Sequence, residues 1–386
     1  MKVLLTQKMA GISGSERYFL SFLPELRKRG LDAHFLVVQH PRNRQKNLGF
    51  IRELEAYQVP VEVINSRFSI SPWLIWKMAQ FIKVQGFDLL QTNLIHADVW
   101  GACIKSFFIP KLSILSVKHG YSEHYQTLHG LDPKHLKTDL MAVLTRWAGK
   151  RADCVISISE ALNSFMTKGG LISVEKGLAI PYGFDFSFVA STIEQGGLRF
   201  GSPQIVVAGR IVPVKQHHML LKILPALIKQ FPNLAVVMVG TGPLLEHMKR
   251  MSDELGITKN VRWEGFRTNM HDYIRDSDLM VIPSAAEGFG LVVLEAWHHA
   301  KMVVAFDVPA INEVIDDGVN GILVKPFDES RLLATLTHLF ESPADMRRMG
   351  NAGKNKQQVQ YGVSKMVDLT IDQMKDVITK SKSTKH

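Results

Sequence analysis

The sequence is poor in cysteine, has no long apolar run and carries fewer acidic than basic residues. Cys103 and Cys154 are its only cysteines, which excludes a disulfide framework and favours a buried, reduced pair in the cytosol. No uninterrupted apolar segment reaches the length of a membrane span. The opening residues, MKVLLTQ, form too short an apolar run for a signal peptide. We therefore expect a cytoplasmic protein.

The shortage of acidic residues leaves a net charge of +10 and a pI near 9.4. Such an excess favours an acidic partner, such as a phosphorylated substrate or an anionic membrane surface. The basic residues are not interleaved with aromatic ones, as a platform for single strands would require, so no nucleic acid partner is expected.

Apolar runs of strand length alternate with helical patterns along nearly the whole chain, which at 386 residues is long enough for two domains. The predicted strands are 2–7, 34–39, 61–66, 88–94, 112–119, 154–159 and 178–183, then 204–210, 234–240, 261–266, 279–284, 301–308 and 321–325. This pattern predicts α/β architecture: two Rossmann-like, doubly wound domains with a ligand in the cleft that they face. The expected domain bounds are 1–188 and 204–360, with a linker at 189–203 and a last helical segment at 361–386.

The segment 71–85, SPWLIWKMAQFIKVQ, is an apolar helix with two tryptophans and two lysines. It fits a membrane-surface helix, with tryptophans on one face and basic residues on the other, or a helix of the domain core. Its thin polar face favours the core.

Glu287 to Ala296, EGFGLVVLEA, follows a buried-strand pattern and opens a helix. Gly288 and Gly290 allow close backbone approach to a ligand, and free N–H groups at a helix start suit anions and sugar hydroxyls. Glu287 and Glu295 add a carboxylate on either side, although a solvated loop Glu and an ordinary helix Glu would look the same.

Other residues with ligand-binding chemistry also follow predicted strands. Arg210 and Lys215, on one strand-to-helix loop, suit the charge of a diphosphate, and a carboxylate such as Glu295 suits ribose hydroxyls. Two histidines, His96 and His119, follow neighbouring strands in the first half. The remaining candidates are the glycine-rich loop with Gly11, Ser13, Gly14 and Ser15, and later Gly209, Gly240, Gly242, Phe266 and the backbone of Phe289 and Leu291. Together these groups indicate a site for a nucleotide-diphosphate sugar.

Several motifs in this order resemble the large family of retaining GT-B glycosyltransferases with two glutamates eight positions apart (family 4-like, group 1). They are VVAGRIVPVKQH (206–217), VMVGTGP (237–243), VRWEGF (261–266), EGFGLVVLEA (287–296) and INEVIDDGVNGILV (311–324). TNLIHADVWGA (92–102) and VISISEAL (155–162) also resemble family segments.

The resemblance implies a donor site in the second domain and an acceptor site in the first. Arg210 and Lys215 would bind the diphosphate, Glu287 with the backbone at Phe289, Gly290 and Leu291 the sugar, and Glu295 the ribose. It further implies that Gly11 to Ser15 face the phosphates and the acceptor, that His119 lies near the reacting centre, and that the last helix returns to the first domain. No metal is expected, since two fixed cations can take its place, and we favour a UDP-sugar over a GDP-sugar.

The chain departs from the family pattern where Tyr182-Gly183-Phe184-Asp185 replaces the frequent Asn-Gly-(Val/Ile)-Asp. Three alternatives stay open: a GT-B epimerase or phosphorylase, a non-catalytic sugar-nucleotide-binding subunit of an envelope-assembly complex, and a binder of nucleic acid or anionic surfaces.

Overall fold

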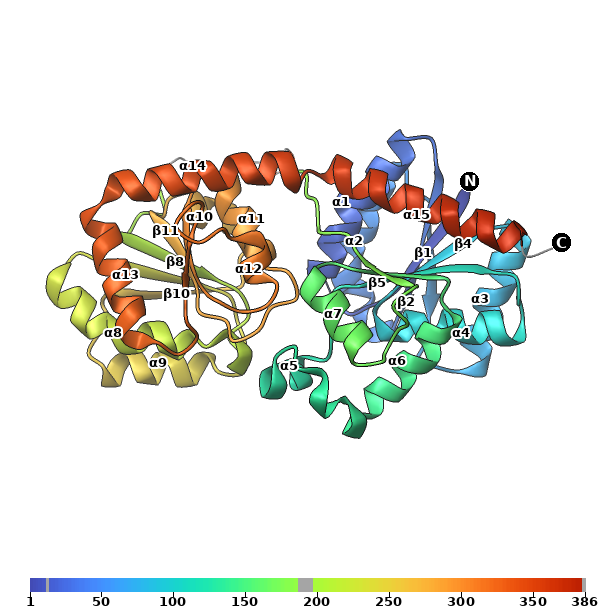
Figure 1. Cartoon of the computed structure of the whole chain (residues 1–386), viewed down its shortest axis with the longest axis horizontal. Coiled ribbons are helices and arrows are strands. Elements are labelled where there is room, and N and C mark those ends of the chain that lie inside the picture. The colour runs from blue at the N-terminus through green and yellow to red at the C-terminus, as the bar shows by residue number, and fades with distance from the viewer. Residues whose placement is uncertain (12–13, 187–196, 384–386) are drawn as a thin grey trace. The chain divides into compact units, whose positions relative to one another are not determined.

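The computed structural model describes residues 1–11, 14–186 and 197–383, which form two compact units (Figure 1). Unit 1 comprises Met1–Ser122, Asp132–Asp185 and Gly362–His386. Unit 2 comprises Glu123–Leu131 and Phe186–Tyr361. The described residues of the expected first domain, 1–188, thus lie in unit 1 except for Glu123–Leu131 and Phe186. The expected linker, 189–203, falls within the described ranges only from residue 197 onward.

Unit 1 contains a seven-stranded parallel sheet with the order β3-β2-β1-β4-β5-β6-β7. Its strands are β1 (Lys2–Met9), β2 (Asp32–Gln39), β3 (Val61–Asn65), β4 (Leu89–Asn93), β5 (Ser113–Lys118), β6 (Cys154–Ser157) and β7 (Gly177–Ala179). Its helices are α1 (Gly14–Lys28), α2 (Arg44–Ala56), α3 (Pro72–Gln85), α4 (Leu94–Phe107), α6 (Leu140–Arg151), α7 (Glu160–Lys168) and α15 (Val363–Ser383), with 3-10 turns η1 (Pro41–Asn43) and η2 (Pro133–Thr138).

Unit 2 contains a six-stranded parallel sheet with the order β10-β9-β8-β11-β12-β13. Its strands are β8 (Gln204–Ala208), β9 (Ala235–Val239), β10 (Val261–Gly265), β11 (Leu279–Ile282), β12 (Met302–Phe306) and β13 (Ile322–Val324). Its helices are α5 (Glu123–His129), α8 (His217–Gln230), α9 (Leu245–Glu254), α10 (Met270–Arg275), α11 (Leu291–His298), α12 (Ile311–Val314), α13 (Glu329–Glu341) and α14 (Pro343–Gln360), with the 3-10 turn η3 (Pro213–Lys215).

Helices cover both faces of each sheet (Figure 1), so the central strands are buried on both faces. This burial explains why β9 and β11 read as continuous apolar runs rather than as alternating patterns, whereas β4 and β5 also bury polar side chains. The predicted α/β class, with two Rossmann-like sheets, is therefore confirmed.

Each sheet has one position at which the strand order reverses. In unit 1 this point lies between β1 and β4, and in unit 2 between β8 and β11. Helices leave the two flanking strands toward opposite faces, which opens a crevice at the carboxyl ends where ligands bind in such folds. The loops after β1, β4, β8 and β11 are therefore the first places to look for a site.

The last helix, α15, belongs to unit 1, where it contacts α1 and β5. Arg29, directly after α1, donates to Asp368 at 2.8 Å and to the Ser364 hydroxyl at 2.6 Å. The expected return of the C-terminal helix to the first unit is thus observed.

Two expectations from the sequence need correction. Helix α3 does pack into unit 1, but Trp73 and Trp76 lie on its exposed side, 52% and 49% accessible, rather than in the core. Both cysteines are free, yet only Cys154 is buried, and Cys103 is partly accessible. Among the described residues, no helix combines the length and apolarity needed to cross a membrane.

Candidate functional site

The candidate donor residues of unit 2 gather at the β8–β11 switch point. Gly209 to Lys215 follow β8, and Glu287 to Gly290 follow β11. The two loops are joined by a backbone hydrogen bond from Ala285 to the carbonyl of Val214, 2.8 Å long. Residues far apart in the sequence are therefore brought to one edge of the sheet.

An ion pair connects these loops: the Lys215 Nζ lies 2.5 Å from Glu287 Oε1. The Lys215 side chain is 25% exposed and that of Glu287 is 11% exposed. Partial burial strengthens such a charge-assisted contact relative to one at an open surface. The pair presents a cation and a carboxylate together at the point where a charged or hydroxylated ligand would bind.

The glycines after β8 and β9 allow two backbone turns to touch. A Cβ on Gly240 would lie 1.9 Å from the carbonyl oxygen of Gly209, and one on Gly242 would lie 2.3 Å from that of Ile211. Hydrogen bonds from Gly209 to Val239 and from Ile211 to Thr241, 3.0 and 2.9 Å, hold the turns together. These positions need glycine because the opposing atoms are backbone and cannot move aside cheaply.

Helix α11 begins at the other side of the same edge. Its N-cap, Gly290, has φ +89°, and a Cβ there would meet Ile311 at 2.5 Å. Phe289 is buried and its ring contacts Tyr361 edge to face. Glu295, one turn into the helix, is buried.

The other predicted donor residues differ in accessibility. Arg210 is exposed directly after Gly209. Phe266, which follows β10, is 68% exposed. Gly288 and Leu291 are partly buried beside Gly290. The structure therefore groups these residues along the carboxyl edge of one sheet.

In unit 1, the partly buried His119 follows β5 and contacts two buried polar side chains. Its Nε2 lies 3.0 Å from Asn93 Oδ1, at the end of β4, and its Nδ1 makes a hydrogen bond with the Tyr182 hydroxyl. The Asn93 amide nitrogen points toward the Thr6 carbonyl at 3.5 Å, which orients its oxygen toward the ring. We therefore assign the proton of neutral His119 to Nε2, with the Tyr182 hydroxyl donating to Nδ1.

Burial and the neighbouring Lys118 ammonium lower the pKa of His119 to about 3. Burial also raises the pKa of the Tyr182 hydroxyl well above its usual value. Both groups are therefore neutral at physiological pH. In this structure His119 is an oriented neutral hydrogen-bonding group rather than a cation.

Removing the Tyr182 hydroxyl in Tyr182→Phe is expected to raise the pKa of His119, because protonation of Nδ1 would no longer break a hydrogen bond. In the wild type, no titration of this ring is expected between about pH 5 and 8. The imidazole proton resonances, followed by NMR against pH, measure the difference. Tyr121→Phe, which removes a hydroxyl bonded to Asp139 in the same unit, is the matched control.

The stability of unit 1 should follow the same titration. The pKa of His119 is depressed in the folded chain, so the neutral ring contributes to the free energy of unfolding. This contribution is fully present above about pH 6.5 and is lost as the pH falls toward 3. As the pH falls over this range, the denaturant midpoint of unfolding should therefore decrease more in the wild type than in His119→Gln. An equal decrease in the two proteins would contradict the assignment.

The remaining predicted residues of unit 1 are placed less completely. Gly11 follows β1 with φ +134°, and Gly14 and Ser15 begin α1. Ser13 lies outside the described residues. His96 is half-buried on α4, where burial and the charge of Lys8 lower its pKa.

The sequence did not identify all of this network. Asn93 lies in the family-like segment 92–102, but its contact with His119 required the β4–β5 pairing. Tyr182 was noticed only as a departure from a family motif. Glu16, buried and hydrogen-bonded to Gln7, was not singled out.

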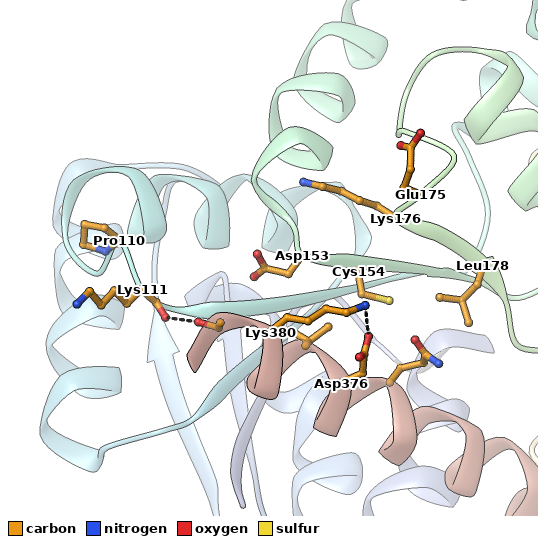
Figure 2. Close-up of a pocket in the computed structure, with 12 residues that line it drawn as sticks. Pro110, Lys111, Asp153, Cys154, Glu175, Lys176, Leu178, Asp376 and Lys380 are labelled. Atoms are coloured by element: carbon orange, nitrogen blue, oxygen red, sulfur yellow. Dashed lines mark hydrogen bonds and ion pairs between the residues drawn. The ribbon is translucent and has the colours of Figure 1, made fainter. Parts of the chain in front are cut away.

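A cavity of 480 Å³ lies elsewhere in unit 1, where α15 passes the amino ends of β5, β6 and β7 (Figure 2). Three of the charged side chains that line it are ion-paired within the unit. Lys380 pairs with Asp376 at 2.6 Å, and Asp153 pairs with Lys105 at the same distance. No predicted site residue lines this cavity. Among the described residues, no group of three or more His, Cys, Asp or Glu side chains is arranged to hold a metal ion.

Comparison with known proteins covers both units. Residues 12–187 match the family described as Glycosyltransferase Family 4, and residues 190–356 match Glycosyl transferases group 1. The lipopolysaccharide core biosynthesis glycosyltransferase LpsD of Rhizobium meliloti is 23% identical over 363 residues, which are 93% of this chain and 94% of LpsD.

Two solved structures share the fold. Anabaena Alr3699/HepE, solved in complex with UDP-glucose, has a TM-score of 0.78 and 22% identity over 97% of this chain and 100% of that one. Sucrose-phosphate synthase of Thermosynechococcus elongatus has a TM-score of 0.78 and 16% identity over 98% of this chain and 99% of that one. With the two family matches and the two Rossmann-like units, the chain belongs to the GT-B glycosyltransferases of group 1 and family 4.

Proposed function

We propose that this protein is a retaining glycosyltransferase that moves a sugar from a nucleotide-diphosphate sugar to a hydroxyl of a glycan, lipid-linked or phosphorylated acceptor. The observation that carries the proposal is the Lys215–Glu287 ion pair at the β8–β11 switch point, a cation and a carboxylate on adjoining loops. The role of LpsD in lipopolysaccharide core synthesis supports a place in cell-surface polysaccharide or lipopolysaccharide assembly.

In the proposed donor site, unit 2 binds each part of the donor with a different group. Arg210 and Lys215 bind the diphosphate, because fixed cations match its charge. Glu287 and the backbone N–H groups from Phe289 to Leu291 bind the transferred sugar, and Glu295 binds the ribose. Gly209, Gly240, Gly242, Gly288, Gly290 and Phe266 complete this site.

The proposed reaction occurs on one face of the sugar. The bond from the anomeric carbon to the diphosphate oxygen breaks as the acceptor oxygen forms a new bond from the same side. A leaving phosphate oxygen takes the acceptor's proton, so the diphosphate departs with that proton and the anomeric configuration is retained. Arg210 and Lys215 stabilise the negative charge that grows on the leaving group, worth several kcal/mol for comparable groups.

Unit 1 is the proposed acceptor domain. Gly11, Ser13, Ser15 and His96 contribute to the acceptor site, and neutral His119 orients a hydroxyl near the reacting centre. The low pKa of His119 argues for a hydrogen-bonding role there rather than a charged one. Two fixed cations make a metal ion unnecessary in this scheme.

We favour a UDP-sugar donor over a GDP-sugar, and the UDP-glucose complex of the HepE protein, which shares the fold, supports this preference. We place the reaction in the cytoplasm, peripherally on the inner face of the cytoplasmic membrane. The net charge of +10 supports attraction to an anionic surface there.

Calorimetric titration with UDP, GDP, ADP and their sugars tests the donor site. We expect one diphosphate to bind selectively and its affinity to fall by at least about tenfold in Arg210→Ala, because one charge-assisted contact is lost. Glu295→Gln should weaken binding of the ribose-containing ligands, whereas Arg331→Ala, a change at an exposed arginine of α13, should leave it unchanged.

Absence of binding by every nucleotide would refute the transferase proposal. Binding without sugar transfer to any lipid-linked or phosphorylated glycan would instead support the non-catalytic subunit.

A further inference from the structure

We propose that the outward face of α3 and the loop before it dock onto a bilayer containing anionic phospholipids. This α3 surface consists of Arg67, Phe68, Ile70, Trp73, Trp76, Lys77, Lys83 and Val84. The proposed function includes an anionic membrane as a partner, and the α3 surface is the part of the protein that contacts it. The proposal rests on that function only for its biological purpose, because docking itself needs neither donor nor catalysis.

The apolar side chains of this surface are unusually accessible. Phe68 is 70% exposed, and Trp73 and Trp76 are 52% and 49% exposed. Ile70 and Val84 are 46% and 79% exposed. Single exposed apolar residues are common, but five within one short segment, two of them tryptophans, mark an interaction surface.

Helix α3 presents this surface rigidly. Its other face, Leu74, Ile75, Met78, Ala79 and Ile82, is buried, and the helix contacts α4. The Ser71 hydroxyl caps the first turn by accepting from Leu74 N at 3.2 Å, and Gly86 ends the helix in a left-handed conformation. Trp73, Trp76, Lys77 and Lys83 therefore point outward because the helical period leaves them there.

The preceding loop is also held in place. The Trp100 indole donates to the Ser69 carbonyl at 2.7 Å, and the Lys8 Nζ donates to the Ser69 hydroxyl at 2.6 Å. Phe68 and Ile70 lie on either side of this anchored residue. The loop thus adds two apolar side chains next to the first turn of α3.

The positive charge of the segment that contains the α3 surface favours an anionic partner. Residues 63–87 contain Arg67, Lys77 and Lys83 but no Asp or Glu. The Lys77 Nζ lies 5.3 Å from the centre of the Trp73 ring, so a cation and an aromatic ring share one site. Tryptophan rings settle at the level of lipid headgroups while lysine stems extend their charge to phosphates. Cations beside tryptophans, in a segment that contains no carboxylate, match an anionic bilayer surface.

Vesicle flotation tests the proposal on the full chain. We expect the wild type to float with vesicles of phosphatidylcholine and phosphatidylglycerol but not with phosphatidylcholine alone. Trp73→Ser/Trp76→Ser and Lys77→Glu/Lys83→Glu should each lower the bound fraction at least about tenfold. Tryptophan emission of the wild type should shift to shorter wavelength on binding, and the shift should be lost in the double serine variant.

Two controls match these changes elsewhere. Lys222→Glu/Lys249→Glu changes the net charge equally at exposed lysines of α8 and α9. Phe107→Ser/Val359→Ser removes two side chains that are 73% and 75% exposed. Both controls should float like the wild type.

No flotation with anionic vesicles, or equal loss in the controls, would overturn the proposal. A concentration-dependent dimer that binds no vesicles and is lost in Trp73→Ser/Trp76→Ser would overturn it in favour of a second copy of the chain. Nucleotide binding measured on the same samples separates the two proposals, since docking without donor binding would refute only the transferase function.

Discussion

Replacement of Lys215 by methionine is expected to lower kcat/KM by roughly two to three orders of magnitude, the usual effect of removing one group that stabilises transition-state charge. Methionine keeps an unbranched side chain of similar length but has no charge to offer the leaving diphosphate. It also leaves Glu287, whose side chain is only 11% exposed, without its lysine partner. Steady-state transfer assays with a saturating acceptor measure the loss.

The division of this loss between kcat and KM identifies the role of Lys215. Charge on the bridging oxygen grows as the bond to the sugar breaks, so most of the loss should fall on kcat. Lys215→Arg keeps the charge in a different geometry and should retain more activity than the methionine variant. An increase in KM with unchanged kcat would show that the lysine binds the donor without assisting bond cleavage.

A matched substitution separates the specific effect of losing Lys215 from the general effect of losing one positive charge. Lys222→Met removes a lysine in α8 whose Nζ pairs with Glu329 at 2.9 Å, with both side chains more than 40% exposed. Its activity should equal that of the wild type. Equal losses at Lys215 and Lys222 would contradict a specific role for Lys215.

Gly240→Ala is expected to destabilise unit 2 by about 3 kcal/mol or more, which is at or above the upper end of the usual cost of overpacking. The same change is expected to abolish nucleotide binding. The new Cβ would lie 1.9 Å from the Gly209 carbonyl oxygen, and the φ of +149° disfavours any side chain. Since the obstructing atom is backbone, relief requires the turns after β8 and β9 to separate. Chemical denaturation and calorimetry with the preferred nucleotide measure the two effects.

The helix glycine Gly49 supplies the control for this change. It lies in α2 of unit 1, and a Cβ there meets nothing within 4 Å. Gly49→Ala should leave nucleotide binding unchanged and raise stability by about 1 kcal/mol, because alanine favours a helix interior. A Gly240→Ala protein as stable as the wild type would show that the two turns are not packed as described.

The architecture was predictable because its causes are local. Apolar runs such as 204–208 and 279–282 have strand length, and the helical patterns between them imply parallel pairing. From that alternation it follows that Arg210, Lys215 and Glu287 lie at the carboxyl edge of one sheet, because residues after parallel strands all meet there. The close approach of Gly240 to Gly209 also has a local signal in the glycine-rich strand ends.

Side-chain pairing was not predictable in the same way. Lys215 and Glu287 are separated by 72 positions and meet only because β8 and β11 are neighbours in the sheet. Tyr182 contacts His119 across 63 positions, and no motif predicts that its hydroxyl makes a hydrogen bond with that ring. The two tryptophans of α3 lie in an apolar helix whose thin polar face favoured the core, yet packing against α4 left both of them outside. Periodicity follows from backbone geometry within one element, whereas partners and exposure depend on strand order and on which face a neighbouring element covers.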